Sequence, residues 1–400
     1  MSAWKNVRLD ECCEIISGAT PSTSVDSYWN GDIDWATPKD LSDLDGSIIS
    51  ETPRKITRAG LEACAASILP IGSVLFSSRA PIGLVAINAA PMATNQGFKS
   101  FVVRPELVWA PFLYWWLRTH RTYLEGLGNG ATFKEVSKAV VSRIEIPLPP
   151  LAEQRRIAEV LDQTEALRAK RRDALARLDV LNEAIFFDLF GDPVANPKSW
   201  SVKPLGNLAI GKPNNGIFRK NHEYVEKGKP GLPVVWVEEL FRGNRIDITN
   251  SRRLDATADE VRKYGLSPGD LLFCRSSLKL DGIAYNNVYL GEDSAALFEC
   301  HVIRISPNQK LLIPAFVNCL LRVSTMRAVA KLNSNTATMT TIGQDGICSL
   351  PIIVPPLALQ RDFACRIAAV DKLKAAHCAS LAELDALFSA LQHRAFRGEL

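Results

Sequence analysis

The side chains best suited to contact a polyanion lie at the ends of short apolar runs and in polar or glycine-rich segments of both halves of this chain. Arginine, lysine, asparagine, glutamine and hydroxyl side chains read base edges in the major groove of DNA, and the basic ones also bind phosphates. In the first half the candidates for such contacts are Ser78, Arg79, Asn95, Gln96, Lys99, Asn129, Thr132 and Lys134. In the second half they are Arg219, Lys220, Arg242, Arg245, Arg275, Ser276 and Lys279.

Each group of candidates has a functional and a structural interpretation. Arg79 and Arg275 stand just after apolar runs, where the end of a strand would present them outward, but they could equally be paired structural side chains. Asn95 and Gln96 could instead cap a turn, and the glycine-rich residues 126–134 could simply connect two elements. Two tryptophans, Trp35 and Trp236, are expected at matching strand positions and are interpreted as core residues rather than stacking platforms.

The search for catalytic chemistry is negative. Residues 211–213 (GKP) place a proline where a phosphate-binding loop needs a hydroxyl residue, and no Gly-x-Gly-x-x-Gly fingerprint opens a helix after a strand. Asn196 and Pro197 resemble the start of an adenine-methyltransferase motif but lack the aromatic residue that would stack a flipped base. The histidines lie far apart, without metal-ligand spacing. The sequence therefore predicts no catalytic residue and no metal site.

An internal repeat is the strongest sign of how the chain is organised. Residues 149–155 (PPLAEQR) recur as residues 355–361 (PPLALQR), at an offset of 206. Weaker matches begin at Trp4 and Trp200, and the offset drifts from 196 to 206 between landmarks, so length differences collect in loops. A repeat of this length is too long for a solenoid and indicates a duplicated domain with a duplicated helix.

Each proline pair is followed by a long helical pattern. Residues spaced alternately by three and four positions, from Ile157 to Leu189 and from Phe363 to Ala395, are apolar at both ends and polar in the middle. This pattern is typical of a coiled-coil seam with a polar break. Because such helices need a partner for their apolar stripe, we expect the two to pair with each other, in antiparallel fashion. Acidic and basic residues balance on both helices, which predicts spacer and partner surfaces rather than a DNA-binding face.

The predicted fold class is α+β: two similar mixed α/β domains separated by two long helices that pack as an antiparallel coiled coil, with a pseudo-twofold internal repeat. Short β-branched and aromatic runs, such as residues 73–76 and 302–305, indicate strands, and helices are expected near residues 111–120 and 314–326. The predicted segments are a first domain at residues 1–148, a first helix at 149–192, a second domain at 193–352 and a second helix at 353–400.

Composition is that of an ordinary globular protein. The chain is 47% hydrophobic and carries a net charge of +4, which permits an anionic partner without demanding one. The N-terminus has no signal-peptide pattern, and the most apolar stretch, residues 108–117, is half as long as a membrane span. The nine cysteines contain no CxxC pair and are expected to be reduced thiols in a cytoplasmic protein.

The order of these segments, over the whole chain, resembles the DNA-specificity subunit of type I restriction-modification systems. The first helix ends in residues 189–193 (LFGDP) and the second in residues 394–400 (RAFRGEL). Residues 17–22, 29–35, 72–79 and 95–99 are similar to recurring segments of that family's target-recognition domains. The second domain departs from this pattern, because it lacks the Asn-Gln-Gly-Phe run and carries Arg275 and Ser276 where the first domain has Ser78 and Arg79.

The resemblance implies a non-catalytic subunit that reads a bipartite, asymmetric target in double-stranded DNA with two recognition domains. It also implies two modification (methyltransferase) subunits and restriction or translocase subunits as partners, and no membrane. No cofactor is expected in this chain, since S-adenosylmethionine, ATP and Mg²⁺ would belong to the partner subunits. The alternatives are a specificity subunit of another methylation-based phage-defence complex, or a coiled-coil protein scaffold whose domains bind peptides or RNA.

Overall fold

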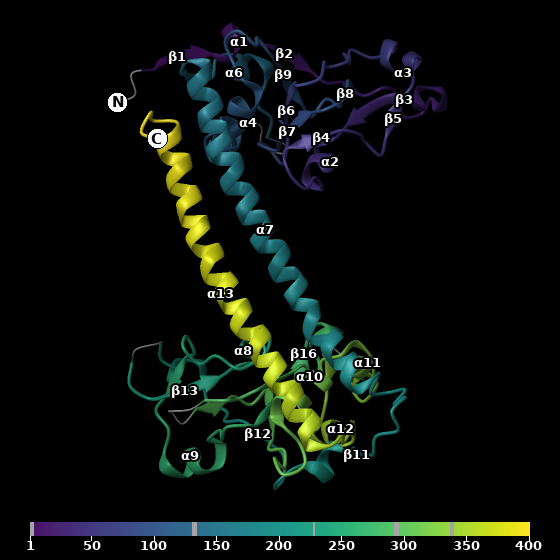
Figure 1. The fold of residues 1–400 in the computed structure, drawn as a ribbon, viewed down its shortest axis with the longest axis vertical. Helices are drawn as coiled ribbons and strands as arrows, with labels where there is room; N and C mark the ends of the chain where they lie inside the picture. Colours follow the sequence, from purple (N-terminus) through teal and green to yellow (C-terminus); the bar gives the residue numbers. More distant parts are fainter. Residues whose placement is uncertain (1–3, 130–133, 227–228, 292–295, 337–339) are drawn as a thin grey trace. The chain divides into compact units, whose positions relative to one another are not determined.

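The computed structural model describes residues 4–129, 134–226, 229–291, 296–336 and 340–400. The chain forms two compact units, of which unit 1 comprises Met1–Arg171 and Ser380–Leu400 and unit 2 comprises Arg172–Ala379. Each unit holds a mixed α/β domain and one part of each long helix, α7 (Leu151–Phe190) and α13 (Leu357–Ala395) (Figure 1). The two predicted long helices are therefore confirmed, while the four predicted segment boundaries stay a prediction.

The domain of unit 1 is built on two sheets and a short antiparallel pair. The larger sheet has, in spatial order, β2 (Cys13–Ser17), β9 (Lys99–Val103), β6 (Val74–Phe76), β7 (Val85–Asn88) and β4 (Ile48–Ile49). The smaller sheet has the order β5 (Lys55–Ile56), β3 (Trp29–Ala36) and β8 (Met92–Thr94), with β3 and β8 parallel. The antiparallel pair consists of β1 (Lys5–Arg8) and β10 (Glu145–Leu148). Val74 and Phe76 of β6 pack in one core with side chains of α4 (Ala110–Thr119), while Leu75 between them packs in a second cluster.

The domain of unit 2 repeats this plan. Its larger sheet has the order β12 (Asn214–Asn215), β19 (Val302–Ile305), β15 (Leu271–Cys274) and β17 (Asn286–Val288). Its smaller sheet has the order β14 (Arg253–Leu254), β13 (Leu232–Val235) and β18 (Leu297–Phe298), and β13 and β18 are again parallel. The antiparallel pair consists of β11 (Val202–Pro204) and β22 (Pro351–Ile353). A third sheet joins β16 (Ser276–Ser277), β21 (Thr340–Thr341) and β20 (Asn335–Thr336). The shared topology confirms the duplication that the repeat predicts.

The remaining helices are short. Unit 1 has α1 (Leu9–Cys12), α2 (Pro38–Ser42), α3 (Arg58–Glu62), α5 (Arg121–Gly126) and α6 (Lys138–Ser142). Unit 2 has α8 (Val237–Leu240), α9 (Ala258–Tyr264), α10 (Pro314–Leu320), α11 (Ser324–Leu332) and α12 (Gln344–Cys348). The single helix expected at residues 314–326 is wrong: Val323 takes an extended conformation and is buried, so packing interrupts the helix there. Among the described residues no helix is long and apolar enough to cross a membrane.

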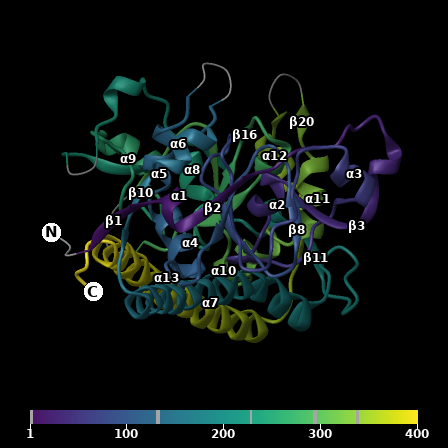
Figure 2. The same ribbon diagram turned by 90° about the horizontal axis from the view of Figure 1, so that it is seen from above.

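Within unit 1, α7 and α13 run side by side in opposite directions (Figures 1 and 2). Arg168 Nε donates to Asp385 Oδ1 at 2.6 Å, and Arg156 Nη2 donates to the carbonyl oxygen of Leu400 at 3.0 Å. Residue numbers thus rise along α7 as they fall along α13. The guanidinium of Arg168 also lies 4.3 Å from the ring centre of Phe388, so this polar residue of the seam is held by both charge and an aromatic face.

Unit 2 contains the other parts of the two helices, also antiparallel. Lys374 Nζ lies 2.9 Å from Asp179 Oδ1, and the ring centre of Phe190 lies 5.4 Å from that of Phe363. At the end of the predicted seam, Ile185 and Leu189 pack against the core but are only partly buried, whereas the neighbouring Phe186 and Phe190 are fully buried. A helix of 3.6 residues per turn drifts against a strict 3.5-residue repeat, and the shift turns these two rings into the domain core.

Gln154 explains the recurring motif at the start of α7. Its Oε1 accepts a hydrogen bond from the backbone nitrogen of Trp109 at 2.8 Å. Its Nε2 donates to the carbonyl oxygens of Leu107 at 2.8 Å and Pro149 at 2.9 Å. The amide is completely buried. The glutamine therefore ties the start of the long helix to the loop that leads into α4.

Gln360 repeats this arrangement in unit 2. Its Oε1 accepts from the backbone nitrogen of Ile313 at 2.8 Å. Its Nε2 donates to the carbonyl oxygens of Leu311 at 3.1 Å and Pro355 at 2.8 Å. This amide is also completely buried. The Pro-Pro-Leu-Ala-x-Gln-Arg motif is thus a structural device that joins each domain to its own helix.

Candidate nucleic-acid interface

Three of the groups of candidate residues that the sequence predicts in unit 1 lie together at the end of strand β6. The backbone nitrogen of Ser78 donates to the carbonyl oxygen of Gly97 at 2.7 Å, and that of Val136 donates to the carbonyl oxygen of Ser78 at 2.8 Å. These two hydrogen bonds hold the strand end, the polar run that begins at Asn95 and the glycine-rich loop against one another. Ser78 itself is completely buried, so its side chain supports this surface from inside.

Glu135 connects the charges of the same three groups. One carboxylate oxygen lies 3.0 Å from Arg79 Nε and the other lies 3.3 Å from Lys99 Nζ. The Lys99 side chain is only 8% exposed, whereas that of Arg79 is 44% exposed. Burial alone would raise the pKa of Glu135, but the hydrogen bonds from Lys99 and Arg79 outweigh it and lower that pKa. Sequence analysis missed Glu135, because an isolated acidic residue in a polar loop carries no signal of its partners.

The polar run itself is partly a turn. Asn95 Oδ1 accepts a hydrogen bond from the backbone nitrogen of Gly97 at 2.9 Å, which is the turn-capping role of the structural interpretation. Gln96 is exposed, and its side-chain oxygen accepts a hydrogen bond from the hydroxyl of Thr20. In the glycine-rich loop, the backbones of Asn129 and Glu135 pair through hydrogen bonds of 3.1 and 3.0 Å.

The other loop candidates lie at the rim of this surface. Asn129 and Lys134 are exposed, and Thr132 lies outside the described residues. We define the recognition surface of unit 1 as the exposed residues Arg79, Gln96, Asn129 and Lys134 together with the half-buried Asn95.

Replacing Glu135 by glutamine should lower the stability of unit 1. The variant leaves the nearly buried ammonium of Lys99 without its carboxylate, which is expected to cost about 1–3 kcal/mol of unfolding free energy at neutral pH. Because the folded state lowers the pKa of Glu135, this stabilisation is present above the pKa of the unfolded state and is lost as pH falls through the folded pKa. Thermal unfolding at neutral and at acidic pH measures both effects.

The control for this prediction is Glu62→Gln. Glu62 pairs with Arg58 at 2.8 Å, but both side chains are well exposed, so its loss is expected to change stability by less than about 0.5 kcal/mol. Equal melting temperatures for the Glu135→Gln variant and the unaltered protein at neutral pH would contradict the structural role of Glu135.

Unit 2 builds an equivalent strand end with different side chains. The backbone nitrogen of Arg275 donates to the carbonyl oxygen of His301 at 2.8 Å, and that of Ile342 donates to the carbonyl oxygen of Arg275 at 2.9 Å. Arg275 therefore takes the place of Ser78, and His301 that of Gly97. The guanidinium of Arg275 is exposed and forms no ion pair or side-chain hydrogen bond with another described residue. Its neighbour Ser276 pairs with Thr341, just as Arg79 forms a bridge with Glu135.

The remaining candidates of unit 2 are distributed over separate elements. Arg219 forms ion pairs with Glu260 and, at 3.5 Å, with Glu223. Arg242 lies 3.7 Å from Glu238. Lys220 and Arg245 are exposed. No interaction between described residues joins this group to Arg275, so the structure does not assemble it into one cluster.

Lys279 and Ser276 line an open cavity of about 630 Å³. Its wall is largely apolar, and it includes Phe241, Leu278 and Tyr285, of which Leu278 is 87% exposed. We define the recognition surface of unit 2 as Arg275, Ser276 and Lys279 with the turn at His301.

The two tryptophans do not occupy matching positions, contrary to expectation. Trp35 lies on β3, is 2% exposed and donates from Nε1 to the carbonyl oxygen of Ala19 at 3.0 Å, which agrees with a core role. Trp236 follows β13 and caps α8 through its backbone nitrogen, which donates to Glu239. Thr37 caps α2 in the same way, so Trp236 corresponds to Thr37. Trp236 therefore lies two positions beyond the equivalent of Trp35, outside the strand.

Comparison with known proteins agrees with this architecture. Residues 1–177 match the type I restriction modification DNA specificity domain. The chain is 30% identical over 381 residues to the MjaIX type I restriction enzyme specificity subunit of Methanocaldococcus jannaschii, which covers 90% of this chain and 85% of the relative. It is 26% identical over 359 residues to the EcoKI specificity subunit of Escherichia coli, covering 81% and 73% of the two chains.

A solved structure shows the same fold. The crystal structure of the type I restriction-modification S subunit from M. genitalium matches 99% of this chain and 96% of its own with a TM-score of 0.59, at 14% identity. The predicted fold class, two mixed α/β domains with two long helices, is thereby confirmed. The relatives are specificity subunits, a recognition role without catalysis, which also confirms the prediction of a non-catalytic chain. Its repeat, its fold and its similarity over most of its length place this chain in the family of type I restriction enzyme specificity subunits.

Proposed function

We propose that this chain reads a bipartite, asymmetric target in double-stranded DNA, with one half-site for each domain. The observation that carries this proposal is the pair of equivalent strand ends, which share backbone hydrogen bonds but not side chains. Ser78 and Gly97 of unit 1 correspond to Arg275 and His301 of unit 2. Two identical surfaces would favour a symmetric target, whereas unlike surfaces on one backbone plan favour two different half-sites.

The exposed polar residues of the two recognition surfaces make the DNA contacts in this proposal. Arg275 is the strongest candidate for reading a base, because its guanidinium is exposed and a bidentate arginine suits the edge of guanine. In unit 1, Arg79 is held by Glu135 and is better suited to a fixed contact with phosphate or base. Lys99 and Ser78 are buried, so they act by supporting the surface.

The helices α7 and α13 serve as the spacer and as the surface for partners. The relatives are subunits of type I restriction enzymes, which supports modification and restriction subunits as the partners of this chain. We propose two modification subunits, one for each repeat of the domain and helix. S-adenosylmethionine, ATP and Mg²⁺ would act in those partners, and no cofactor is assigned to this chain.

Methylome sequencing of a host that carries the complete operon tests the proposed function. The expected result is a single methylated motif made of two different half-sites separated by unspecified bases. Deletion of this chain's gene should abolish the methylation. A contiguous or palindromic motif, or methylation that persists without this chain, would contradict the proposal. If the chain were a peptide-binding scaffold, methylome sequencing would show no methylated DNA motif that depends on it.

Replacing Arg275 by alanine should relax recognition in one half-site only. Loss of a base-reading arginine is expected to cost about 1–3 kcal/mol of discrimination at one base pair. The methylome of the variant should therefore become degenerate at one position of one half-site and keep the other half-site unchanged. Arg262→Ala is the control, because Arg262 is an exposed arginine of α9 in the same domain, pairs with Asp259 and lies outside both the recognition surface and the long helices. An unaltered motif in the Arg275→Ala variant would remove this residue from base recognition.

A further inference from the structure

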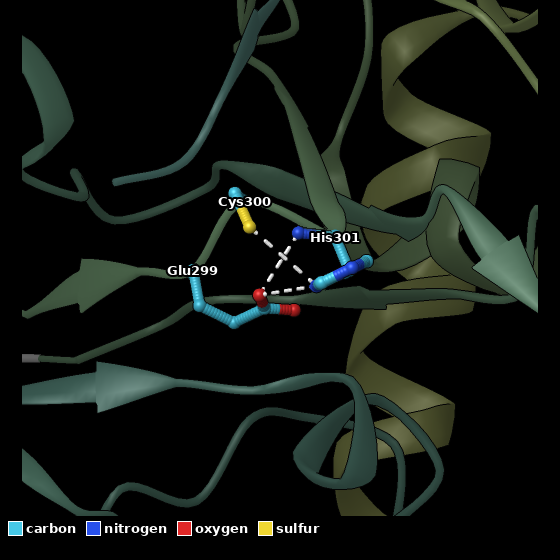
Figure 3. Close-up of side chains that lie close together, drawn as sticks. All are labelled: Glu299, Cys300 and His301. Carbon is cyan, nitrogen blue, oxygen red and sulfur yellow. Dashed lines mark hydrogen bonds and ion pairs between the residues drawn. The ribbon is translucent and has the colours of Figure 1, made fainter. Parts of the chain in front are cut away.

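A tight turn in unit 2 gathers three different metal-ligating side chains. The turn joins β18 to β19, and the backbone nitrogen of Val302 closes it by donating to the carbonyl oxygen of Glu299 at 3.0 Å. Figure 3 shows the side chains of Glu299, Cys300 and His301 close together at this turn. Their ligand atoms all lie within 4.8 Å of one another. Outside this turn, no such group of three occurs among the described residues.

The distances within the group suit a common ion. His301 Nδ1 lies 2.8 Å from Glu299 Oε2 and 3.5 Å from Cys300 Sγ. In a tetrahedral zinc site, bonds of about 2.0 Å to nitrogen and oxygen and about 2.3 Å to sulfur place neighbouring ligand atoms roughly 3.3–3.6 Å apart. The sulfur and the ring nitrogen already have this separation. The carboxylate and the ring nitrogen need to move apart by only about 0.5 Å.

A buried carboxylate supplies the second, independent observation. Glu299 is 2% exposed, and its Oε1 has no hydrogen-bond partner among the described residues. Its Oε2 is used within the turn, by the backbone nitrogen and the ring of His301. No described lysine or arginine forms an ion pair with it. A buried carboxylate is costly without a cation. In the described part of the chain its one cationic partner is the His301 ring, and only when that ring is protonated, so a bound cation would supply the positive charge that a neutral imidazole does not.

We propose that Glu299, Cys300 and His301 bind a divalent, borderline-soft metal ion of the Zn²⁺ type. One thiolate, one imidazole and one carboxylate form a donor set that zinc accepts and that magnesium and calcium do not prefer. The His301 side chain is 58% exposed, so a fourth coordination position faces solvent. The sequence prediction of no metal site considered separated histidines and cysteines and therefore overlooked three consecutive ligands.

The ion would stiffen the recognition surface of unit 2 and leave that of unit 1 unaffected. The carbonyl oxygen of His301 accepts the hydrogen bond from Arg275, so fixing the turn also fixes the backbone of Arg275. In unit 1 the equivalent positions hold Asn95, Gln96 and Gly97, which offer neither thiolate nor imidazole. The proposed metal site therefore occurs in the domain of unit 2 and not in that of unit 1, so the two recognition domains differ in this feature.

Titration of the metal-free, full-length chain with Co²⁺ tests the proposal without DNA. The expected result is one bound ion per chain with a near-ultraviolet band from thiolate-to-cobalt charge transfer, and displacement of that ion by Zn²⁺. Cys300→Ser should abolish the band, and Cys365→Ser should keep it, because Cys365 is an exposed thiol on α13. Glu299→Gln and His301→Asn should each weaken Co²⁺ binding by more than about 10-fold.

The outcomes distinguish a turn that binds a metal ion from a turn that does not. Absence of the band in the unaltered protein, or its persistence in Cys300→Ser, would overturn the proposal. Circular dichroism shows whether each variant is folded; if Cys300→Ser is not, the surface variant His301→Asn decides by its Co²⁺ affinity. Zn²⁺ should also raise the melting temperature of the unaltered protein and not that of His301→Asn. None of these results depends on the DNA target, so they stand apart from the test of the proposed function.

Discussion

Replacing Gln154 by leucine is expected to lower the unfolding free energy of unit 1 by about 3–5 kcal/mol. The amide satisfies one buried backbone group, on Pro149, and two part-buried ones, on Trp109 and Leu107, and leucine satisfies none of them. A buried group left without a partner costs about 1–3 kcal/mol, and each part-buried group lies at the low end of that range. The volume of the side chain is nearly conserved, so lost hydrogen bonds dominate the effect. Calorimetry of the full chain measures it as a lower melting temperature of the affected transition.

The matched control lies on the same helix. Gln163 is exposed, and its replacement by leucine removes a glutamine without opening any buried hydrogen bond, so its effect should stay within about 0.5 kcal/mol. Gln360→Leu should reproduce the loss in unit 2, because Gln360 makes the same three bonds there. If Gln154→Leu melted like Gln163→Leu, the motif would owe its recurrence to something other than this clamp.

The architecture was accessible from sequence because it rests on periodic and repeated features. The proline pair fixes where each long helix can begin, and α7 and α13 start at Leu151 and Leu357, directly after those pairs. Apolar runs such as residues 302–305 appear as strands with the expected bounds. The shared topology of the two domains follows from the internal repeat, whose offset changes only through loops of different length. Local patterns of this kind need no knowledge of distant contacts.

The parts that sequence analysis missed depend on contacts between distant segments. Glu135 pairs with Arg79 and Lys99, which lie 56 and 36 residues away in the sequence. No local sequence pattern therefore predicts these contacts of Glu135. The buried rings of Phe186 and Phe190 follow from how α7 meets the domain core, not from the heptad. Glu299 differs in kind: its neighbours in sequence are its partners, but only the turn shows that its carboxylate is buried.

The recognition candidates divide in a similar way. Residues next to a strand end, such as Ser78 and Arg275, are placed correctly by sequence because strand ends are local features. Which of them faces solvent is decided by the fold: Ser78 is buried, whereas Arg275 is exposed. The basic residues Arg219 and Arg242 engage acidic neighbours, which charge alone could not reveal.

Removing one matched heptad from the two helices should shorten the unspecified spacer of the DNA target by about three base pairs. Seven helical residues span roughly 10.5 Å, and base pairs rise about 3.4 Å each. Arg168 lies opposite Asp385, and Asp179 lies opposite Lys374, so the matched deletion takes residues 172–178 and 375–381. A whole heptad keeps the seam in phase, so both cross-helix pairs survive. Methylome sequencing of hosts with the altered operon reads the new spacer directly.

The half-site sequences should stay the same in this variant, because the recognition surfaces are untouched. Three base pairs also turn one half-site by about 100° around the DNA axis, so methylation is expected to be slower as well as shifted. Deleting residues 172–178 alone is the control: it moves Asp179 away from Lys374 and should abolish methylation rather than shift the motif. If the matched deletion methylated the original spacing at full rate, the helices would not set the spacer. If it changed the half-site sequences, recognition would extend beyond the strand-end surfaces.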